Sequence, residues 1–425
     1  MNAPKPSARR KVLVTDAGRG CAIAFLRSLG RKGWHVIAAD SDARSAGFRS
    51  RFVAERFVYP APQNSPRAFV ESLHAFVAEQ GVDLVIPVTD ECIHPLARAR
   101  ARFEGLTRLA IAHDEALATV ADKHATLDLA QRLGVPVPET RLVRTLAEAR
   151  RAAGELAFPL VLKPAVSRLY HAAEDRIEAG HVTFARDLPE LERRMQPLVG
   201  RHEVLLQSYE GGAGVGVECL AHEGRILCAF QHRRLAEIPV SGGASAWRES
   251  VALDPVLFGH AQKLIEALRW TGLVMVEFKL GTQPWLLEIN GRVWGSLPLA
   301  CLSGVDFPGE LAELYCPSGA ACAPLGPSEA AYAPLATPYR VGVRAYNFEL
   351  MLYWIAQVLL GRARHPYLPY PRRQRALAGL WSLLDPTQKS DLAGGIDFAP
   401  RLGEAGRIVR KLAAKLGGAR AAEAH

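Results

Sequence analysis

Residues 274–292, with the sequence VMVEFKLGTQPWLLEINGR, carry two glutamates and an asparagine within strand-like runs. If residues 281–284 form a four-residue hairpin loop, Glu277 lies directly opposite Glu288, and Asn290 points to the same face. Like charges placed opposite each other destabilise a sheet, whereas a hard cation between the two carboxylates would stabilise it. The spacing therefore predicts either an Mg²⁺ site or a solvated sheet face with nearby basic side chains, and it does not decide between the two.

Basic side chains precede this segment at three places. Lys123 lies early in a helical stretch, Lys163 ends the apolar run FPLVLK, and residues 231–234 read QHRR. Because neighbours on a strand point to opposite faces, only one of Arg233 and Arg234 can face a common site. Each of these residues alone is weak evidence, since a single lysine is more often a surface residue.

Residues 239–249, with the sequence PVSGGASAWRE, are rich in Ser and Gly and are predicted to form a loop between a strand and a helix. Consecutive backbone N–H groups in such a loop can cradle an anion. Arg248 could bind a carboxylate or an acyl phosphate with both arms of its guanidinium, which makes it a candidate catalytic residue. The alternative is a flexible connector.

The elements that must position these residues begin with a parallel sheet. Strand and helix signals alternate from the apolar run at 11–16 onward, which is typical of an α/β fold. Gly18, Gly20 and Asp40 partly match a dinucleotide-binding fingerprint, but Ile23 stands where the third glycine belongs. An NAD(P)-dependent oxidoreductase therefore stays open as a remote alternative.

Four features in this order resemble an ATP-grasp ligase of the carbamoyl-phosphate synthase and biotin carboxylase branch. They are Lys123, Lys163, the hinge-like segment LLQSYEGG at 205–212, and the hairpin ending in LEINGR. The resemblance covers roughly residues 119 to 305. It implies an α/β protein in which a Rossmann-like parallel pre-ATP-grasp domain (1–118) precedes an α+β ATP-grasp domain (119–315). A Pro-rich linker and a helical, basic extension (316–425) would follow.

The resemblance also implies an ADP-forming carboxylate–amine or carboxylate–thiol ligase that uses ATP with Mg²⁺ or Mn²⁺. ATP would phosphorylate a small-molecule carboxylate, and an amine or another nucleophile would displace phosphate from the acyl phosphate. The implied site residues are Glu277, Glu288 and Asn290 for the metal, Lys123, Lys163, Gln207, Tyr209, Glu210 and Arg233 for the nucleotide, and Arg292 facing the transferred phosphoryl group.

The sequence departs from the family pattern at two points. Residues 165–172 (AVSRLYHA) contain no glycine where a glycine-rich loop usually folds over the phosphates. Past the hinge, only Glu210 or Glu218 could take the place of the acidic residue that often contacts ribose. These departures keep open a non-catalytic ATP-binding regulatory or scaffold protein.

Composition excludes several other classes. The chain has 425 residues, of which 49% are hydrophobic and 22% charged, so general disorder is excluded. No apolar run reaches the roughly 18 residues of a membrane-spanning helix, and the N-terminus leaves no room for a secretory signal. The net charge of +9 is dispersed, so nucleic acid is not an expected partner. We expect a cytoplasmic homo-oligomer with reduced cysteines. Residues 350–364 could contact a membrane surface, but a buried core helix is the favoured interpretation.

Overall fold

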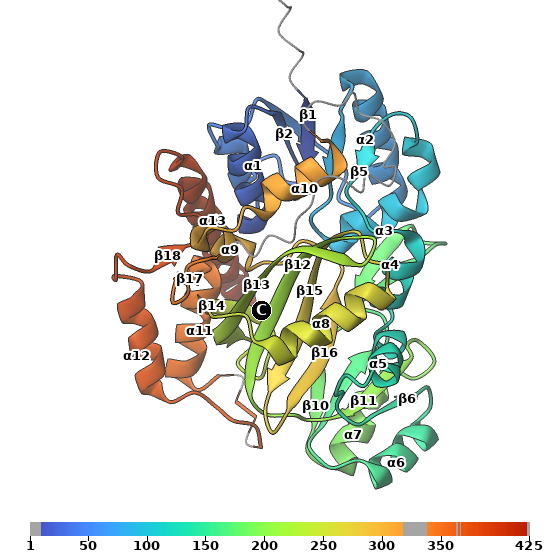
Figure 1. Ribbon diagram of the computed structural model, residues 1–425. Helices are drawn as coiled ribbons and strands as arrows, with labels where there is room; N and C mark the ends of the chain where they lie inside the picture. The colour runs from blue at the N-terminus through green and yellow to red at the C-terminus, as the bar shows by residue number, and fades with distance from the viewer. Residues whose placement is uncertain (1–9, 318–337, 363, 366, 423–425) are drawn as a thin grey trace, which may run out of the picture.

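The computed structural model describes residues 10–317, 338–362, 364–365 and 367–422, with the side chains of 412–422 excepted. Most of the Pro-rich linker expected from residue 316 lies outside these residues. The element order confirms the predicted α/β class. The fold has three main sheets, and helices pack on their faces (Figure 1).

The first part of the chain forms a parallel sheet of five strands in the order β3-β2-β1-β4-β5, counted over the described residues. The apolar run predicted as a buried strand becomes the central strand β1, because α1 and α10 cover one face of the sheet and α2 and α3 the other. The strands are β1 (Lys11–Val14), β2 (His35–Asp40), β3 (Glu55–Val58), β4 (Leu84–Ile86) and β5 (Arg108–Leu109). The helices of this part are α1 (Gly20–Arg31), η1 (Ala46–Arg49), α2 (Pro66–Gln80), α3 (Asp90–Arg98), η2 (Arg100–Phe103) and α4 (Asp114–Ala121).

A smaller lobe follows. Its antiparallel sheet has the order β10-β7-β11-β6, and α6 and α7 pack on one face of it around a separate apolar core. The elements are α5 (Lys123–Arg132), β6 (Thr140–Val143), α6 (Leu146–Glu155), β7 (Leu160–Pro164), β10 (Thr183–Ala185), α7 (Leu188–Met195) and β11 (Val204–Ser208). Between β7 and β10, the chain forms a separate hairpin of β8 (Arg168–His171) and β9 (Arg176–Ala179).

The largest sheet, which carries the residues of the predicted site, has the order β16-β15-β12-β13-β14-β17-β18 within the part of the chain that the structure describes. Helix α8 packs on one face, and α9 and α10 cover part of the other. The elements are β12 (Ala213–His222), β13 (Arg225–Ile238), β14 (Ala244–Ser250), α8 (Pro255–Ala267), β15 (Gly272–Leu280), β16 (Pro284–Asn290), α9 (Leu297–Ser303) and α10 (Phe307–Tyr315).

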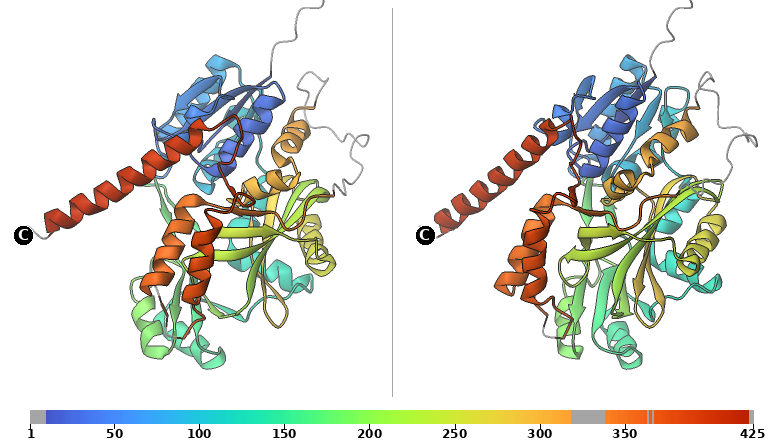
Figure 2. Two further views of the ribbon diagram at one scale, coloured as in Figure 1. Left: turned by 90° about the vertical axis from the view of Figure 1, so that its left-hand side faces the viewer. Right: turned by 60° about the vertical axis from the view of Figure 1, so that its left-hand side comes forward.

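The C-terminal part is not only a helical extension, because two of its strands join this largest sheet. It consists of β17 (Arg344–Tyr346), α11 (Phe348–Leu360), α12 (Arg373–Ser382), β18 (Lys389–Ser390) and α13 (Ala399–Ala422). Helix α11 buries Met351, Trp354, Ile355 and Val358, as expected for a core helix, and α12 lies outside it (Figure 2). Helix α13 begins against η1 of the N-terminal part and then projects from the body. No helix among the described residues is long and apolar enough to cross a bilayer.

The prediction that residues 239–249 form a loop is wrong over most of its length. Only residues 239–243 connect strands, because Ala244–Ser250 form β14, which pairs with β13 on one side and β17 on the other. Small residues such as Ala and Ser indicate a strand weakly by themselves. The pairing is set by neighbouring strands, one of which lies about a hundred residues further along the chain.

Candidate active site

The hairpin of β15 and β16 brings the two glutamates together, but not by the predicted loop. Leu280 pairs with Pro284, so the connection is one residue shorter than expected. A register shift after Phe278 and Leu286 then restores the predicted pair, Glu277 opposite Glu288. Such a bulge adds one residue to one strand only, and it compensates the shorter turn.

A cluster of charged side chains surrounds these carboxylates, and we refer to Lys123, Lys163, Arg234, Glu277, Glu288 and Asn290 as the charged cluster. The Asn290 side-chain amide donates to Glu277 Oε1 at 3.0 Å and to Glu288 Oε1 at 3.3 Å. A guanidinium nitrogen of Arg234 lies 2.6 Å from Glu277 Oε2, and Lys123 Nζ lies 3.4 Å from Glu288 Oε2. The two carboxylates can lie side by side because each is paired with a basic side chain.

The lysines reach the cluster from the smaller lobe. Asp122 caps the start of α5 by accepting from the backbone N–H groups of His124 and Ala125, which places Lys123 at the first position of the helix. Lys163 projects from β7 and donates to Gln207 Oε1 at 2.8 Å. The site therefore lies between the smaller sheet and the largest sheet.

Burial and charge shift the pKa values of the cluster in opposite directions. Burial lowers the pKa of Lys163 to about 8, with Lys123 adding to the effect and Glu288 opposing it. Burial alone would raise the pKa of Glu288, but Lys123 and Lys163 outweigh it and hold that pKa at about 2. Glu288 is therefore a stable anion, whereas Lys163 can lose its proton in mildly alkaline solution.

Arg292 stands at the border between the cluster and the N-terminal sheet. Its Nε lies 3.2 Å from Asp90 Oδ2, at the start of α3. Burial would lower its pKa, but Asp90 and Glu288 outweigh burial and raise it. The side chain is therefore a permanent cation next to the carboxylates.

The three predicted nucleotide ligands of the hinge-like segment, Gln207, Tyr209 and Glu210, have different neighbours. Gln207 is buried, and its amide donates to Thr140 Oγ1 at 3.0 Å while its carbonyl oxygen accepts from Lys163. Tyr209 packs against Phe184, with ring centroids 6.2 Å apart. Glu210 is half-buried, and burial together with Glu139 raises its pKa. Only Gln207 touches a member of the charged cluster among these three.

Arg233 does not face the cluster, which corrects the sequence prediction. Its side chain is 52% exposed and pairs with Glu249 at 2.7 Å on the other face of the sheet. The next residue, Arg234, makes the contact with Glu277 instead. Strand alternation predicted that only one of the pair would point inward, but it did not tell which one.

Arg248 also has a different role from the predicted one. It lies opposite Arg234 on the sheet, but the C-terminal part covers it. Its side chain is 1% exposed and forms an ion pair with Asp391, which is 3% exposed, just after β18. Arg248 therefore binds a carboxylate, as its chemistry suggested, but the carboxylate belongs to the same chain.

A fully buried pair, His232 and Glu218, lies beside the charged cluster on the same face of the sheet. His232 Nδ1 is 2.9 Å from Glu218 Oε1, which also accepts from the Ser296 hydroxyl at 2.7 Å. Gly216 leaves room for the ring, because a Cβ there would lie 2.5 Å from His232 Cε1. The ring of His232 is therefore held next to Glu218 in the interior of the sheet face.

The glycine-free segment after Lys163 forms the β8–β9 hairpin, which contacts the N-terminal part. Arg168 Nε lies 2.8 Å from Glu91 Oε1, and the Ser167 hydroxyl bonds with Lys123. Asp175, at the tip of the hairpin, accepts from the Ser65 hydroxyl and from the Arg67 backbone N–H. The hairpin therefore spans the smaller lobe and the N-terminal sheet beside the charged cluster.

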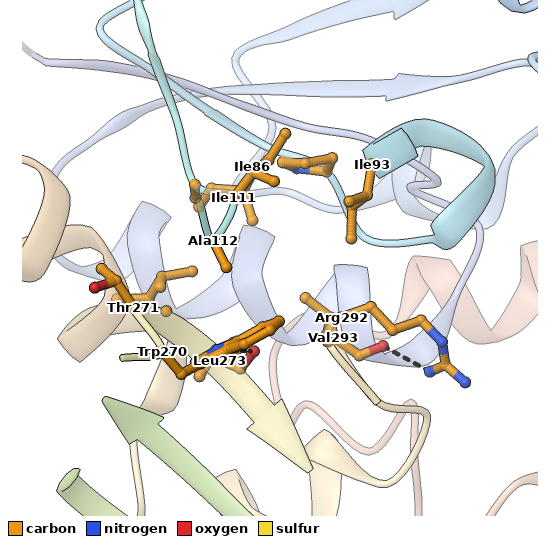
Figure 3. Close-up of a pocket in the computed structure, with 14 residues that line it drawn as sticks. Ile86, Ile93, Ile111, Ala112, Trp270, Thr271, Leu273, Arg292 and Val293 are labelled. Atoms are coloured by element: carbon orange, nitrogen blue, oxygen red, sulfur yellow. Dashed lines mark hydrogen bonds between the residues drawn. The ribbon is translucent and has the colours of Figure 1, made fainter. Parts of the chain in front are cut away.

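A separate pocket lies at the border between the N-terminal sheet and the β15–β16 hairpin (Figure 3). Ile86, Ile93, Ile111 and Trp270 give it an apolar lining. Arg292 contributes to its edge, but its guanidinium extends away from these apolar side chains and donates to the Val293 carbonyl oxygen. The pocket suits an apolar group, whereas the charged cluster suits phosphate and metal.

The charged cluster has the oxygen donors that Mg²⁺ prefers, namely two carboxylates and an amide. The Asn290 amide can present either its NH₂ group or its oxygen at the same place. No group of three or more His, Cys, Asp or Glu side chains that could hold a metal is found among the described residues. Two carboxylates and one amide supply fewer oxygens than the octahedral shell of Mg²⁺ needs, so an ion bound here would take the rest from water or phosphate.

Known proteins resemble this chain in sequence. Residues 201–324 match the family described as "ATP-grasp in the biosynthetic pathway with Ter operon". The chain is 28% identical over 219 residues to the carbamoyl phosphate synthase large chain of Thermus thermophilus, covering 48% of this chain and 20% of that one. The chain thus spans about a fifth of that relative.

Solved structures share the fold. The biotin carboxylase domain of Hydrogenobacter thermophilus 2-oxoglutarate carboxylase, in complex with MgADP, ADP and bicarbonate, has a TM-score of 0.58 at 18% identity, covering 72% of this chain and 69% of that chain. The L-amino acid ligase of Bacillus licheniformis has a TM-score of 0.54 at 18% identity, covering 71% and 73%. The family match, the similarity to carbamoyl phosphate synthase and the fold shared with biotin carboxylase therefore support the predicted resemblance to ATP-grasp ligases of that branch.

Proposed function

We propose that the protein is an ADP-forming ligase that activates a small-molecule carboxylate with ATP. The observation that carries this proposal is the charged cluster, in which Glu277, Glu288 and Asn290 meet Lys123 and Lys163 between two sheets. A cluster of this composition suits the triphosphate of ATP and its metal. The ATP-grasp relatives support the same reading.

In this proposal Glu277, Glu288 and Asn290 hold Mg²⁺, which neutralises phosphate charge when bound. Lys123 and Arg234 release their carboxylate partners and contact phosphate oxygens instead, and Lys163 contacts phosphate oxygens from β7. Gln207 keeps Lys163 oriented through its carbonyl oxygen. Catalysis rests mainly on positioning and charge neutralisation, as in other phosphoryl transfers.

Arg292 faces the transferred phosphoryl group. A carboxylate oxygen of the substrate attacks the γ-phosphorus, and the bond from phosphorus to the β,γ-bridging oxygen breaks to release ADP. An amine or another nucleophile then attacks the acyl carbon and expels phosphate. Asp90 holds the guanidinium of Arg292 at the border with the N-terminal sheet, so we place the carboxylate there. Tyr209 and Glu210 lie along the hinge at the adenine side.

The experiment is a screen of carboxylates with MgATP and hydroxylamine, because hydroxylamine converts an acyl phosphate into a hydroxamate that gives a coloured iron complex. Hydroxamate formation that requires both ATP and one class of carboxylate, and that is lost in Glu288→Gln, supports the proposal. ATP binding without hydroxamate or ADP for any carboxylate and nucleophile contradicts it. Small-molecule substrates, the exclusion of nucleic acid and a homo-oligomer belong to the same proposal.

The second candidate is a non-catalytic ATP-binding protein. The glycine-free hairpin that follows Lys163 favours it, since that hairpin has few residues that would let the backbone approach phosphates closely. It predicts MgATP binding with no phosphoryl transfer, even to water. The oxidoreductase alternative has less support, because Asp40 already accepts from the Gly18 backbone N–H at 2.7 Å and from the Ser45 hydroxyl at 2.8 Å.

A further inference from the structure

Helix α12 exposes an apolar face that the proposed ligase activity does not use. Leu377, Leu380 and Trp381 on the helix, and Leu384 in the turn that follows it, have the sequence spacing of one helix face. Their exposed fractions are 56%, 47%, 73% and 73%. We refer to these four residues as the α12 ridge. Single exposed leucines are common, but four large apolar side chains in one row mark an interaction surface.

The ridge is not a core surface that happened to stay open, because the other face of α12 is already packed. Ala376 is buried there, and Gly379 lets the helix approach closely, since a Cβ at Gly379 would lie 2.9 Å from the Trp354 ring. Helix α11, which carries Trp354, separates α12 from the largest sheet (Figure 2). The ridge therefore faces outward by construction, at the edge of the molecule (Figure 1).

Positive charge precedes the ridge along the chain. Residues 361–384 contain five arginines and no acidic residue. Arg372, Arg373 and Arg375 are exposed, and in the described part of the chain none of them has a carboxylate partner. The nearest acidic residue in sequence, Asp385, is engaged by Thr387 and Gln388.

The exposed apolar row and the unpaired arginines together limit the kinds of partner that could bind this surface. A second copy of the chain that bound ridge to ridge would bring two sets of arginines together, because a twofold contact uses the same patch on both sides. Nucleic acid would pair with the arginines but would leave Leu377, Leu380 and Leu384 exposed. An anionic lipid surface takes both, since Trp and Leu insert at the interface while arginines contact headgroups.

We propose that the α12 ridge and its arginines bind the protein to the surface of an anionic membrane. The ridge is convex, as a helix lying on the outside of another helix must be, and a convex apolar row can enter the headgroup layer without a groove in the partner. From the sequence, residues 350–364 could contact a membrane surface, but a buried core helix was the favoured interpretation. The structure buries most of the apolar side chains of that helix and exposes those of the next one.

The test is sedimentation of the full chain with vesicles of phosphatidylcholine alone or with about 30% phosphatidylserine. We expect binding to the anionic vesicles only, and loss of binding as salt rises to about 0.5 M. The triple variant Leu380→Ser/Trp381→Ala/Leu384→Ser and the triple variant Arg372→Gln/Arg373→Gln/Arg375→Gln each weaken binding by about tenfold or more. Val256→Ser, an equally exposed apolar residue on α8, leaves binding unchanged.

A second measurement does not depend on how the triple variants fold. The fluorescence of Trp381, taken as the difference between the wild type and Trp381→Phe, shifts to the blue with anionic vesicles and is quenched by brominated acyl chains. Absence of vesicle binding overturns the proposal, as does binding of both triple variants at the level of the wild type. A concentration-dependent dimer that the first triple variant abolishes also overturns it and assigns the ridge to a second copy. Binding to an acidic protein in place of vesicles does so as well.

Discussion

Glu277 and Glu288 are adjacent on neighbouring strands although both are acidic, and three other residues make this tolerable. Arg234 pairs with one carboxylate, Lys123 with the other, and the Asn290 amide bridges them. A buried charge is costly when its partner is removed. Both carboxylates are therefore neutralised within the cluster, and a ligand that replaces one of their partners must bring an equivalent charge.

We expect Glu288→Gln to abolish stabilisation by MgATP, because the amide removes the anion that faces Lys123 and would hold the metal. In the wild type, a ligand at about 100 times its dissociation constant stabilises the folded state by roughly 2.7 kcal/mol, a shift of several degrees in Tm. A thermal melt with MgATP and with ATP plus EDTA measures this. Glu249→Gln, on the same sheet but paired with Arg233 and Arg344, should keep the full shift. An unchanged shift in Glu288→Gln contradicts the metal assignment.

Lys163 gives the site a pH dependence of defined sign. Burial lowers its pKa to about 8, so above that pH the free protein must take up a proton before a phosphate group can pair with the ammonium. We expect the affinity for MgATP, measured by calorimetry, to fall by up to about tenfold per pH unit above pH 8. In Lys163→Arg the affinity should stay level to about pH 10, because a guanidinium keeps its proton. A fall of equal slope in both proteins would assign the effect to another group.

The same lysine affects stability in the opposite direction. Its pKa in the unfolded chain is that of an ordinary lysine, so between pH 8 and the ordinary value the unfolded state binds more protons than the folded state. The contribution of Lys163 to stability therefore increases as pH rises through this window. Loss of binding above pH 8 thus would not reflect unfolding caused by this group.

At the scale of the element, strand β13 assigns opposite roles to two adjacent arginines. Arg234 points to the charged cluster and Arg233 to the other face of the sheet, where Glu249 accepts from it. We expect Arg234→Ala to weaken MgATP binding by about tenfold or more, since truncating one partner of a buried charge pair costs several kcal/mol. Arg233→Ala should change it less than about twofold, because exposed ion pairs contribute little. Calorimetric titration of both variants decides, and equal losses would contradict the assigned faces.

Sequence information was sufficient for local elements and insufficient for pairing over long distances. The β15–β16 hairpin was predictable because its turn and both strands lie within one short segment. The predicted loop was one residue too long, and the two glutamates pair as predicted only because a bulge compensates for the difference. Which of Arg233 and Arg234 faces the site was not predictable, since alternation fixes only that they point to opposite faces. Each strand alone leaves that choice open.

The burial of Arg248 under the C-terminal part could not be predicted from the sequence for a related reason. Its partner Asp391 lies 143 positions further along the chain, and no local pattern links the two. The same holds for β14, which the composition presented as a loop until β13 and β17 supplied its hydrogen bonds. The lysines and the glutamates of the site could be found because each stands in a recognisable local motif.

At the scale of the whole molecule, the C-terminal part ties the N-terminal sheet to the sheet of the site. Arg27 on α1 pairs with Asp397 at 2.8 Å, and both side chains are nearly inaccessible. Ser50 and the Arg51 backbone N–H also donate to that carboxylate, which together with Arg27 outweighs burial and lowers its pKa.

We expect Asp397→Asn to lower the free energy of unfolding by about 3–5 kcal/mol, because it leaves Arg27 buried with its charge unpaired. Faster hydrogen exchange between β18 and the start of α13 should accompany the loss, since this segment is held there by the same contacts. Arg150→Ala removes an exposed ion pair with Glu192 and should cost no more than about 1 kcal/mol. Thermal melts and exchange measured by mass spectrometry test both variants. A similar decrease in the free energy of unfolding for both variants would contradict the importance assigned to the buried Arg27–Asp397 pair.

The position of β17 has a consequence for the newly made chain. Strand β14 is complete at Ser250, but the strand that pairs with its outer edge begins only at Arg344. While a ribosome adds the intervening residues, the backbone of β14 remains an open edge that another nascent chain could join. Chaperone demand during synthesis should therefore peak over this interval, and a translational pause placed just before codon 344 should increase aggregation more than a pause placed just after β18.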